Sequence, residues 1–272
     1  MEFPVGLSNI RNTCYINSVL QCILGLSDFC KEFVSLTLTD SLLVSLQKFI
    51  VYSYSVKKKV IIKPVSFLKN VFKTTSLFKI GIDGDANEFL LFLLDYIDTH
   101  SNSSIIKDYF YGTMERKSFC EGKDCGKTTT QKEQFNFINI NPMNLNTHNA
   151  YFNAFQEETL ISKCQFCSKV TPKVIQTNVV IEPKVLILQV ERHGDKLQKE
   201  IFINNNVSSR DFIGSIFYFG NGGGVGHYNY SGIVNKKLYN IDDSIVTESN
   251  HIGRNSYLIT YGKLKKSNDM FV

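Results

Sequence analysis

The chain has 272 residues, of which 43% are hydrophobic and 20% are charged, and its formal net charge is +5. These values favour a folded protein with a sizeable core over intrinsic disorder. No stretch approaches the roughly 18–20 uninterrupted apolar residues of a membrane-spanning helix, and the small basic excess does not by itself indicate nucleic acid. The start of the chain lacks the basic and apolar blocks of a secretory signal. We therefore expect an intracellular protein, cytoplasmic or nuclear, without a membrane partner.

The first hundred residues carry apolar side chains at helical spacing. This spacing predicts amphipathic helices over residues 14–27, 41–50, 64–72 and 85–97. Asn12 or Thr13 would cap the first helix, and Pro64 would open the third, because its fixed φ suits a first turn. Asp85 and Glu88 have the spacing of a capping box in front of the fourth helix.

After about residue 105 the pattern becomes that of β-structure. Runs rich in Thr, Val, Ile and Phe predict extended segments at 128–140 and 174–181, and 185–192 has the composition of a buried strand. Further strands are predicted at 215–220, 227–234 and 256–261, with a glycine-rich loop over 220–226. Helices followed by a sheet indicate an α+β fold.

The cysteines fall into two groups, at positions 14, 22 and 30 and at positions 120, 125, 164 and 167. An odd number without a signal peptide argues against a disulfide framework and favours a reducing compartment. The second group forms a C-x₄-C pair and a C-x₂-C pair, and four thiolates are the usual ligands of structural zinc. Reduced thiols of a vestigial site are the alternative. We interpret Cys22 and Cys30 as packing residues.

Cys14 is the candidate nucleophile. It stands at the predicted start of a helix, where free N–H groups and the helix dipole are expected to lower the pKa of a thiol. His227 can take the thiol proton and return it to a leaving amine, and Asp242 or Asp243 can come back on a neighbouring strand to hold the imidazole. Spacing alone leaves ordinary interpretations open, namely a packed cysteine, a loop histidine and an acidic turn.

The sequence around these residues resembles a known family. GLSNIRNTCYINSVLQCIL (6–24) resembles the cysteine box of the ubiquitin-specific proteases, papain-like deubiquitinating enzymes, and GHYNYSGIVNKKLYNIDDSIVTES (226–249) resembles their histidine box. DANEFLLFLLD (85–95), LILQVERH (186–193) and SYLITY (256–261) resemble three further segments of the family, in the family's order. Arg11 departs from the pattern because it replaces a glycine near the oxyanion, and Gly84 replaces a glutamine.

The resemblance implies a papain-like fold with a helical thumb, zinc-bearing β fingers and a β-sheet palm in a single domain over residues 1–272. Residues 1–105 would form the thumb, 106–184 the fingers and 185–272 the palm. Cys14 would be the nucleophile, His227 the general base and then acid, and Asp242 the residue that orients the imidazole. Asp243 would be an adjacent polar helper. Asn9 would donate its side-chain amide to the oxyanion; a buried structural amide is the alternative.

The resemblance also implies contacts with ubiquitin and with zinc. Asp85 and Glu88 would face the basic C-terminal tail of ubiquitin, although a purely structural capping box is also compatible with them. Tyr228 would form a wall of the tail channel, or else pack in the core. The paired cysteines lie where the family carries a structural zinc, and the ligands would be Cys120, Cys125, Cys164 and Cys167.

The implied activity is hydrolysis of the bond after the C-terminal glycine of ubiquitin, with ubiquitin and ubiquitinated proteins as partners. No organic cofactor and no nucleic acid are expected. One alternative is a ubiquitin-binding pseudoenzyme, for which Arg11 is the argument. A papain-like protease for a related modifier or for a viral polyprotein is a second alternative. A zinc-ribbon module that binds nucleic acid would explain the cysteine pairs and the charge, but not the two boxes.

Overall fold

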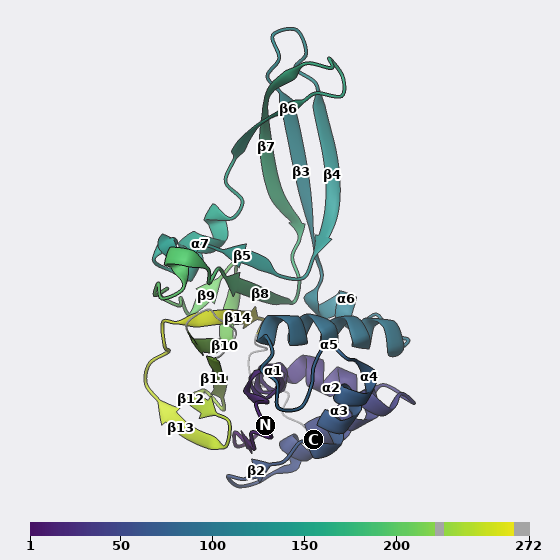
Figure 1. The fold of residues 1–272 in the computed structure, drawn as a ribbon, viewed down its shortest axis with the longest axis vertical. Helices are drawn as coiled ribbons and strands as arrows, with labels where there is room; N and C mark the ends of the chain where they lie inside the picture. The colour runs from purple at the N-terminus through teal and green to yellow at the C-terminus, as the bar shows by residue number, and fades with distance from the viewer. Residues whose placement is uncertain (221–225, 264–272) are drawn as a thin grey trace.

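The computed structural model describes residues 1–220 and 226–263, so most of the predicted glycine-rich loop lies outside the described residues. The first part, the thumb, consists of helices at the lower right of Figure 1. They are α1 (Cys14–Gly25), α2 (Ser27–Ser35), α3 (Ser41–Ser55), α4 (Val65–Thr74), α5 (Ala86–His100) and α6 (Ile105–Phe110). The four predicted helices are confirmed; α2 and α6 were missed because they are short and show the repeated apolar face over few turns. No helix of the described ranges has the length and apolarity that a membrane crossing needs.

The second part, the fingers, is a sheet that extends away from the rest of the molecule (Figure 1). Its strands are β3 (Gly112–Cys120), β4 (Thr128–Phe135), β6 (Glu158–Lys163) and β7 (Val170–Ile181), in the antiparallel order β4-β3-β7-β6. Both faces of β4 and β6 are largely exposed. β3 and β6 were not predicted, because their sequences, GTMERKSFC and ETLISK, lack the alternation of apolar and polar residues that marks a half-buried strand.

The third part, the palm, is a sheet in the order β13-β12-β11-β10-β14-β8-β5. Its strands are β5 (Ile138–Ile140), β8 (Val185–Val190), β10 (Arg210–Gly220), β11 (Gly226–Val234), β12 (Lys237–Asp242), β13 (Ile245–Ser249) and β14 (Ser256–Gly262). The short strand β9 (Asn206–Val207) pairs with the start of β10. A separate parallel pair joins β1 (Gly6–Leu7) to β2 (Ile61–Ile62). β5 and the helix α7 (Thr147–Asn153), from the interval 106–184, pack with the palm.

The main core lies between the thumb and one face of the palm. Every residue from Cys14 to Leu24 is buried, since α1 packs against β10 and β11 on one side and α5 on the other. Cys22 and Cys30 are buried in this core, as expected of packing residues. A second core covers the opposite face of the palm under α7. The cysteine at the start of α1 is therefore held on a helix that the core surrounds.

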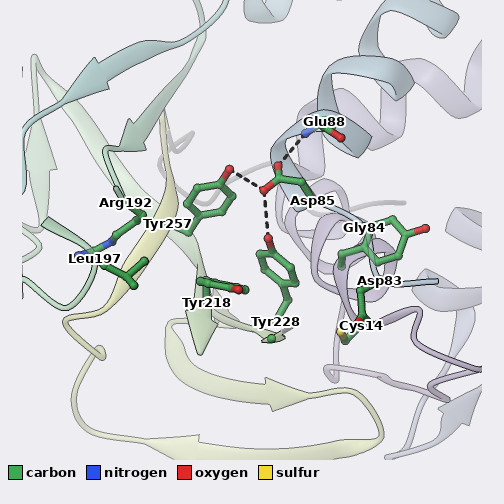
Figure 2. Close-up of a pocket in the computed structure, with 12 residues that line it drawn as sticks. Cys14, Asp83, Gly84, Asp85, Glu88, Arg192, Leu197, Tyr218, Tyr228 and Tyr257 are labelled. Atoms are coloured by element: carbon green, nitrogen blue, oxygen red, sulfur yellow. Dashed lines mark hydrogen bonds between the residues drawn. The ribbon is translucent and has the colours of Figure 1, made fainter. Parts of the chain in front are cut away.

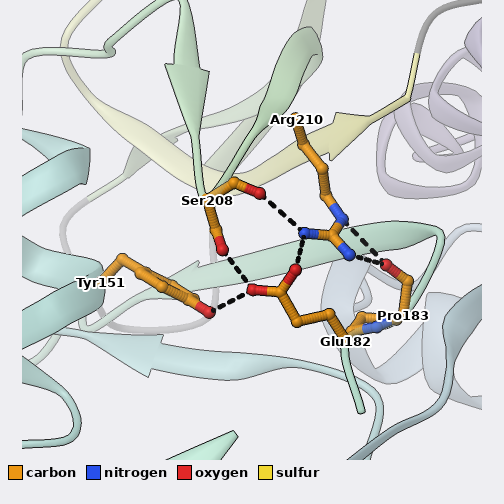
Figure 3. Close-up of polar contacts among 5 residues, drawn as sticks. All are labelled: Tyr151, Glu182, Pro183, Ser208 and Arg210. Atoms are coloured by element: carbon orange, nitrogen blue, oxygen red, sulfur yellow. Dashed lines mark hydrogen bonds and ion pairs between the residues drawn. The ribbon is translucent and has the colours of Figure 1, made fainter. Parts of the chain in front are cut away.

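A buried arginine fixes the junction between fingers and palm (Figure 3). The side chain of Arg210 is 3% exposed and donates to the Pro183 carbonyl, the Ser208 carbonyl and the Glu182 carboxylate, the last at 2.7 Å. Glu182 follows β7 and also accepts the hydroxyls of Ser208 and Tyr151. The Glu182 side chain is 36% exposed, so the desolvated partner of this ion pair is the guanidinium, and loss of its acceptors would leave a buried charge unpaired. This network therefore holds the connection from β7 to β8 against the palm.

Candidate active site

A cavity of about 330 Å³ lies where the thumb meets the palm (Figure 2). The thumb side of its wall consists of Cys14, Tyr15, Asp83, Gly84, Asp85 and Glu88. The palm side consists of Arg192, Leu197, Tyr218, Gly226, Tyr228 and Tyr257. The cavity thus joins residues that lie far apart in the sequence, including Cys14 of the cysteine box and Tyr228 of the histidine box.

Cys14 is the first residue of α1. Thr13 occupies the N-cap position, but its side chain does not cap the helix and instead accepts a hydrogen bond from the Ile10 backbone N–H at 2.9 Å. Among the described residues, no side chain caps the N–H groups of the first turn, and that of Tyr15 acts on the Cys14 sulfur itself.

The environment of Cys14 favours the protonated thiol. Burial raises the pKa of Cys14 above its usual value, and the carboxylates of Asp243 and Asp83 add to this effect. The backbone N–H groups of Tyr228 and Tyr15 act in the opposite direction but do not reverse it. The lowered pKa expected for a thiol at a helix N-terminus is therefore wrong for the free protein, because desolvation outweighs the helix end.

His227 and Asp242 form a direct pair. The Nε2 atom of His227, on β11, lies 2.5 Å from an Oδ1 atom of Asp242 at the end of the adjacent strand β12. With the described residues, the Nδ1 atom of the same ring forms no hydrogen bond. Within the described residues, no hydrogen bond joins the ring to the Cys14 thiol. The two residues are connected through Tyr228, the residue after His227, because its backbone N–H lowers the pKa of Cys14 through a hydrogen bond.

Asp243 has a different set of partners from Asp242. Its φ of 49° turns the chain, and its carboxylate accepts the side-chain amides of Asn17 at 2.7 Å and Asn9 at 2.8 Å. The Oδ1 atom of Asn9 in turn accepts the Thr13 backbone N–H at 2.9 Å. Asn9 is exposed rather than buried, and it is fixed between Asp243 and the start of α1. Its amide keeps a second N–H, so the assignment to the oxyanion stays a prediction.

Arg11 adopts the conformation that a glycine would adopt. Its φ is 53°, that of Asn12 is 65°, and the Arg11 carbonyl accepts the Gly81 N–H at 3.0 Å. A left-handed conformation costs a residue with a side chain roughly 1–2 kcal/mol. The Arg11 side chain is exposed, so the loop before Cys14 takes the left-handed turn without placing that side chain in the core.

Asp85 links the thumb to the palm, because one of its carboxylate oxygens accepts hydrogen bonds from the thumb and the other accepts them from the palm. Oδ1 caps α5 by accepting the N–H groups of Asn87 and Glu88 at 2.7 and 3.0 Å. Oδ2 accepts the hydroxyls of Tyr257 and Tyr228 at 2.8 and 3.1 Å, as Figure 2 shows. Burial, together with this carboxylate, raises the pKa of both tyrosines. Asp85 therefore has a structural role whether or not it contacts a ligand.

Asp83 is a residue of the cavity that the sequence analysis missed. It is partly buried, and with the described residues it forms neither a hydrogen bond nor an ion pair. Glu88 is exposed at the same wall. Gly84, between Asp83 and Asp85, packs closely on Tyr15: a Cβ there would lie 2.7 Å from the ring. No signal in the sequence separates Asp83 from an ordinary loop carboxylate, because its position in the cavity depends on this packing.

Four cysteine sulfurs meet at the outer end of the fingers, within 4.8 Å of one another: Cys120, Cys125, Cys164 and Cys167. Sulfurs at about 2.3 Å from a tetrahedral zinc ion are about 3.8 Å apart, and the sulfurs of Cys125 and Cys164 are 3.8 Å apart. The N–H groups of Cys167 and Phe166 lower the pKa of Cys164 to about 6, which favours the thiolate that a metal needs. The Lys127 N–H acts in the same direction on Cys125, but burial and the other three thiols raise the pKa of Cys125 to about 11, so without a positive charge the cluster does not favour four thiolates. The donor set therefore fits structural zinc, even with the longer C-x₄-C spacing.

Comparison with known proteins gives consistent matches. Residues 5–261 match the family model described as ubiquitin carboxyl-terminal hydrolase. The chain is 22% identical over 223 residues to ubiquitin carboxyl-terminal hydrolase 25 of Arabidopsis thaliana, covering 70% of this chain and 33% of the relative. It is 24% identical over 264 residues to ubiquitin carboxyl-terminal hydrolase 4 of Saccharomyces cerevisiae, covering 73% of this chain and 28% of the relative. The chain thus spans about a third or less of these relatives' length.

A solved structure has the same fold. A chain from the SAGA DUB module of Ubp8, Sgf11, Sus1 and Sgf73 bound to monoubiquitin superposes with a TM-score of 0.78 at 18% identity. The superposition covers 96% of this chain and 69% of that chain. The α+β fold and the family model agree over nearly the whole sequence, and the chain therefore belongs to the ubiquitin carboxyl-terminal hydrolase family.

Proposed function

We propose that this chain is a cysteine-type deubiquitinating enzyme that hydrolyses the bond after the C-terminal glycine of ubiquitin. The observation that carries the proposal is the pairing of His227 with Asp242 at 2.5 Å, beside the cavity that contains Cys14. Family membership and the likeness to a chain solved with monoubiquitin support ubiquitin, free or conjugated, as the partner.

In the proposed mechanism, the Nδ1 atom of His227 takes the proton of Cys14, and the sulfur attacks the carbonyl carbon of the last glycine. The negative charge on the oxygen is met by the N–H groups at the start of α1 and by the Asn9 amide. The C–N bond then breaks, and His227 returns the proton to the leaving amine. Water hydrolyses the thioester, with His227 again as base, and Asp242 holds the imidazole throughout.

The acidic side chains of the cavity, Asp83 and Glu88, are proposed to face the basic tail of ubiquitin. Tyr228 contributes a wall of the same channel. Asp85 acts there through its tyrosine partners, because both of its oxygens already accept hydrogen bonds. In this proposal residues 1–105, 106–184 and 185–272 are parts of one catalytic domain.

We also propose that the four clustered cysteines hold zinc. All four ligands come from the protein, so no position stays open for water and the metal is structural. The outer end of the fingers, where β3 ends at Cys120, lies far from α1, which agrees with that role (Figure 1).

The test is labelling with ubiquitin whose C-terminus carries an alkyne or vinyl electrophile, followed by intact-mass measurement. One ubiquitin adduct is expected on the wild type and none on Cys14→Ala, which should still bind ubiquitin and keep its fold. Binding without an adduct on the wild type would instead indicate a pseudoenzyme. If neither occurs, the proposal fails, and the same electrophile on other ubiquitin-like modifiers tests the alternative substrate.

A further inference from the structure

Arg192 lines the cavity, but its guanidinium is committed to the backbone. Nε and one terminal nitrogen donate to the Ser256 carbonyl, at 3.0 and 2.6 Å. The other terminal nitrogen donates to the carbonyls of Lys196, at 3.3 Å, and Lys199. Burial lowers the pKa of Arg192 to about 10, so the group is still a cation at neutral pH. With the described residues it forms no ion pair, and carbonyl oxygens alone satisfy it.

These carbonyls belong to two separate walls of the cavity. Lys196 and Lys199 flank Leu197, which lines the cavity (Figure 2). Ser256 directly precedes Tyr257, which lines the cavity and donates to Asp85. One planar guanidinium therefore ties the segment 194–199 to the start of β14. A lysine carries a single nitrogen and cannot span these acceptors.

Among the described residues, few other side-chain contacts tie the segment 194–199 to the palm. Lys196 pairs with Glu191, and Gln198 donates to the Gly220 carbonyl at 3.4 Å. The contact of Gln198 is exposed and therefore contributes little. The backbone N–H groups of Leu197 and Lys199 bond only within the segment, to the carbonyls of Gly194 and Lys196, so they do not attach it to β14. The described contact that does so is the guanidinium of Arg192.

We propose that Arg192 is a positioning residue that clamps segment 194–199 against β14 and so sets the width of the substrate channel between Leu197 and Tyr257. This proposal rests on the proposed function for the identity of the substrate. The geometry of the clamp itself does not depend on that function. The channel walls are contacted equally in the ground state and in the transition state, so loosening them should weaken substrate binding more than the chemical step.

The test compares Arg192→Lys and Arg192→Met with the wild type by hydrogen exchange and by steady-state hydrolysis of ubiquitin with a fluorogenic C-terminal amide. Loss of the clamp should speed amide exchange over residues 194–199 by about tenfold or more. It should raise KM about tenfold and change kcat by less than about twofold. Arg254→Gln is the matched control, because the Arg254 side chain is exposed and its one ion pair with the described residues is with Glu200, at 3.2 Å.

Leu197→Ala separates the wall from the clamp. This variant should raise KM without speeding amide exchange over residues 194–199 as much as the Arg192 variants do. In the double variant with Arg192→Lys, the rise in KM should be smaller than the product of the two single rises, because both changes act on one contact. Unchanged exchange over 194–199 in both Arg192 variants would overturn the clamp, and raised exchange with unchanged KM would overturn its role in the channel. A wild type that does not hydrolyse the ubiquitin amide would refute the proposed function instead of the clamp. Wild-type activity is measured before that of any variant, so the two failures are distinguishable.

Discussion

The negative charge around Cys14 affects the pH at which its thiol ionises and becomes a nucleophile. Burial and the carboxylates of Asp243 and Asp83 raise the pKa of Cys14. Asp243 is needed elsewhere, since it binds Asn9 and Asn17. Asp83 forms no hydrogen bond with the described residues, so its negative charge near the thiol can be removed without breaking one.

Replacing Asp83 with Asn should make Cys14 more reactive at low pH. A nearby negative charge disfavours the thiolate, so removing it lowers the pKa of Cys14, and the rise of reactivity with pH should begin at a lower pH. The measurement is the rate of alkylation by iodoacetamide as a function of pH, followed by mass. Glu88→Gln is the control, because Glu88 lines the same cavity but is not among the groups that shift Cys14. An Asp83→Asn profile that coincides with the wild type would contradict the prediction.

At the scale of elements, the fingers have little core of their own. Nearly every residue of β4 and β6 is partly or fully exposed, and the sheet contacts the palm only at its base. At the outer end the cysteine sulfurs are among the few buried groups, with Cys120 and Cys164 both buried. A bound metal would therefore supply there the stability that apolar packing supplies elsewhere.

Removing the proposed zinc should unfold the outer fingers first. Chelation, or the double change Cys164→Ser and Cys167→Ser, should abolish bound zinc and lower the unfolding midpoint, because metal binding is coupled to folding. Elemental analysis of freshly purified protein and thermal unfolding are the measurements. Cys30→Ala, a buried cysteine outside the cluster, should lower stability but leave the metal content unchanged. Wild-type protein without zinc would refute the metal site and leave the Cys14 proposal untouched.

For the whole molecule, the critical contact is the one between thumb and palm. Asp85 begins α5 in the thumb and accepts hydroxyls from Tyr228 and Tyr257 on two strands of the palm. These hydrogen bonds cross the cavity beside Cys14, and the shared apolar core lies beneath them. The two halves of the site are therefore held in register partly by one carboxylate.

Changing Tyr228 and Tyr257 together to Phe should lower the free energy of unfolding by about 1–3 kcal/mol, because a carboxylate oxygen of Asp85 loses both partners. Urea denaturation measures this. Tyr239→Phe is the matched control, since the Tyr239 hydroxyl forms no hydrogen bond with the described residues, and its effect should be small. Equal stability of the double variant and the wild type would show that the core alone holds thumb and palm together.

The sequence by itself determined the helices of the thumb, most palm strands and the residues proposed for catalysis. The helices could be predicted because a repeated apolar face is a local pattern, and Asp85 was identified as a cap because capping is also local. Cys14 and His227 could be named because the residues around them resemble family segments. The fingers were only partly predicted, because strands exposed on both faces carry no such pattern.

Only the tertiary structure decided how side chains distant in sequence meet. Spacing left Asp242 and Asp243 equivalent, and the family resemblance named Asp242. The structure gives the physical reason, because the positive φ of Asp243 turns that carboxylate towards Asn9 and Asn17 while Asp242 pairs with His227. It also reverses the expected pKa shift of Cys14. Local sequence gives the favourable helix end, but burial and neighbouring charge depend on residues distant in sequence, such as Asp83 and Asp243, and in a desolvated site these dominate.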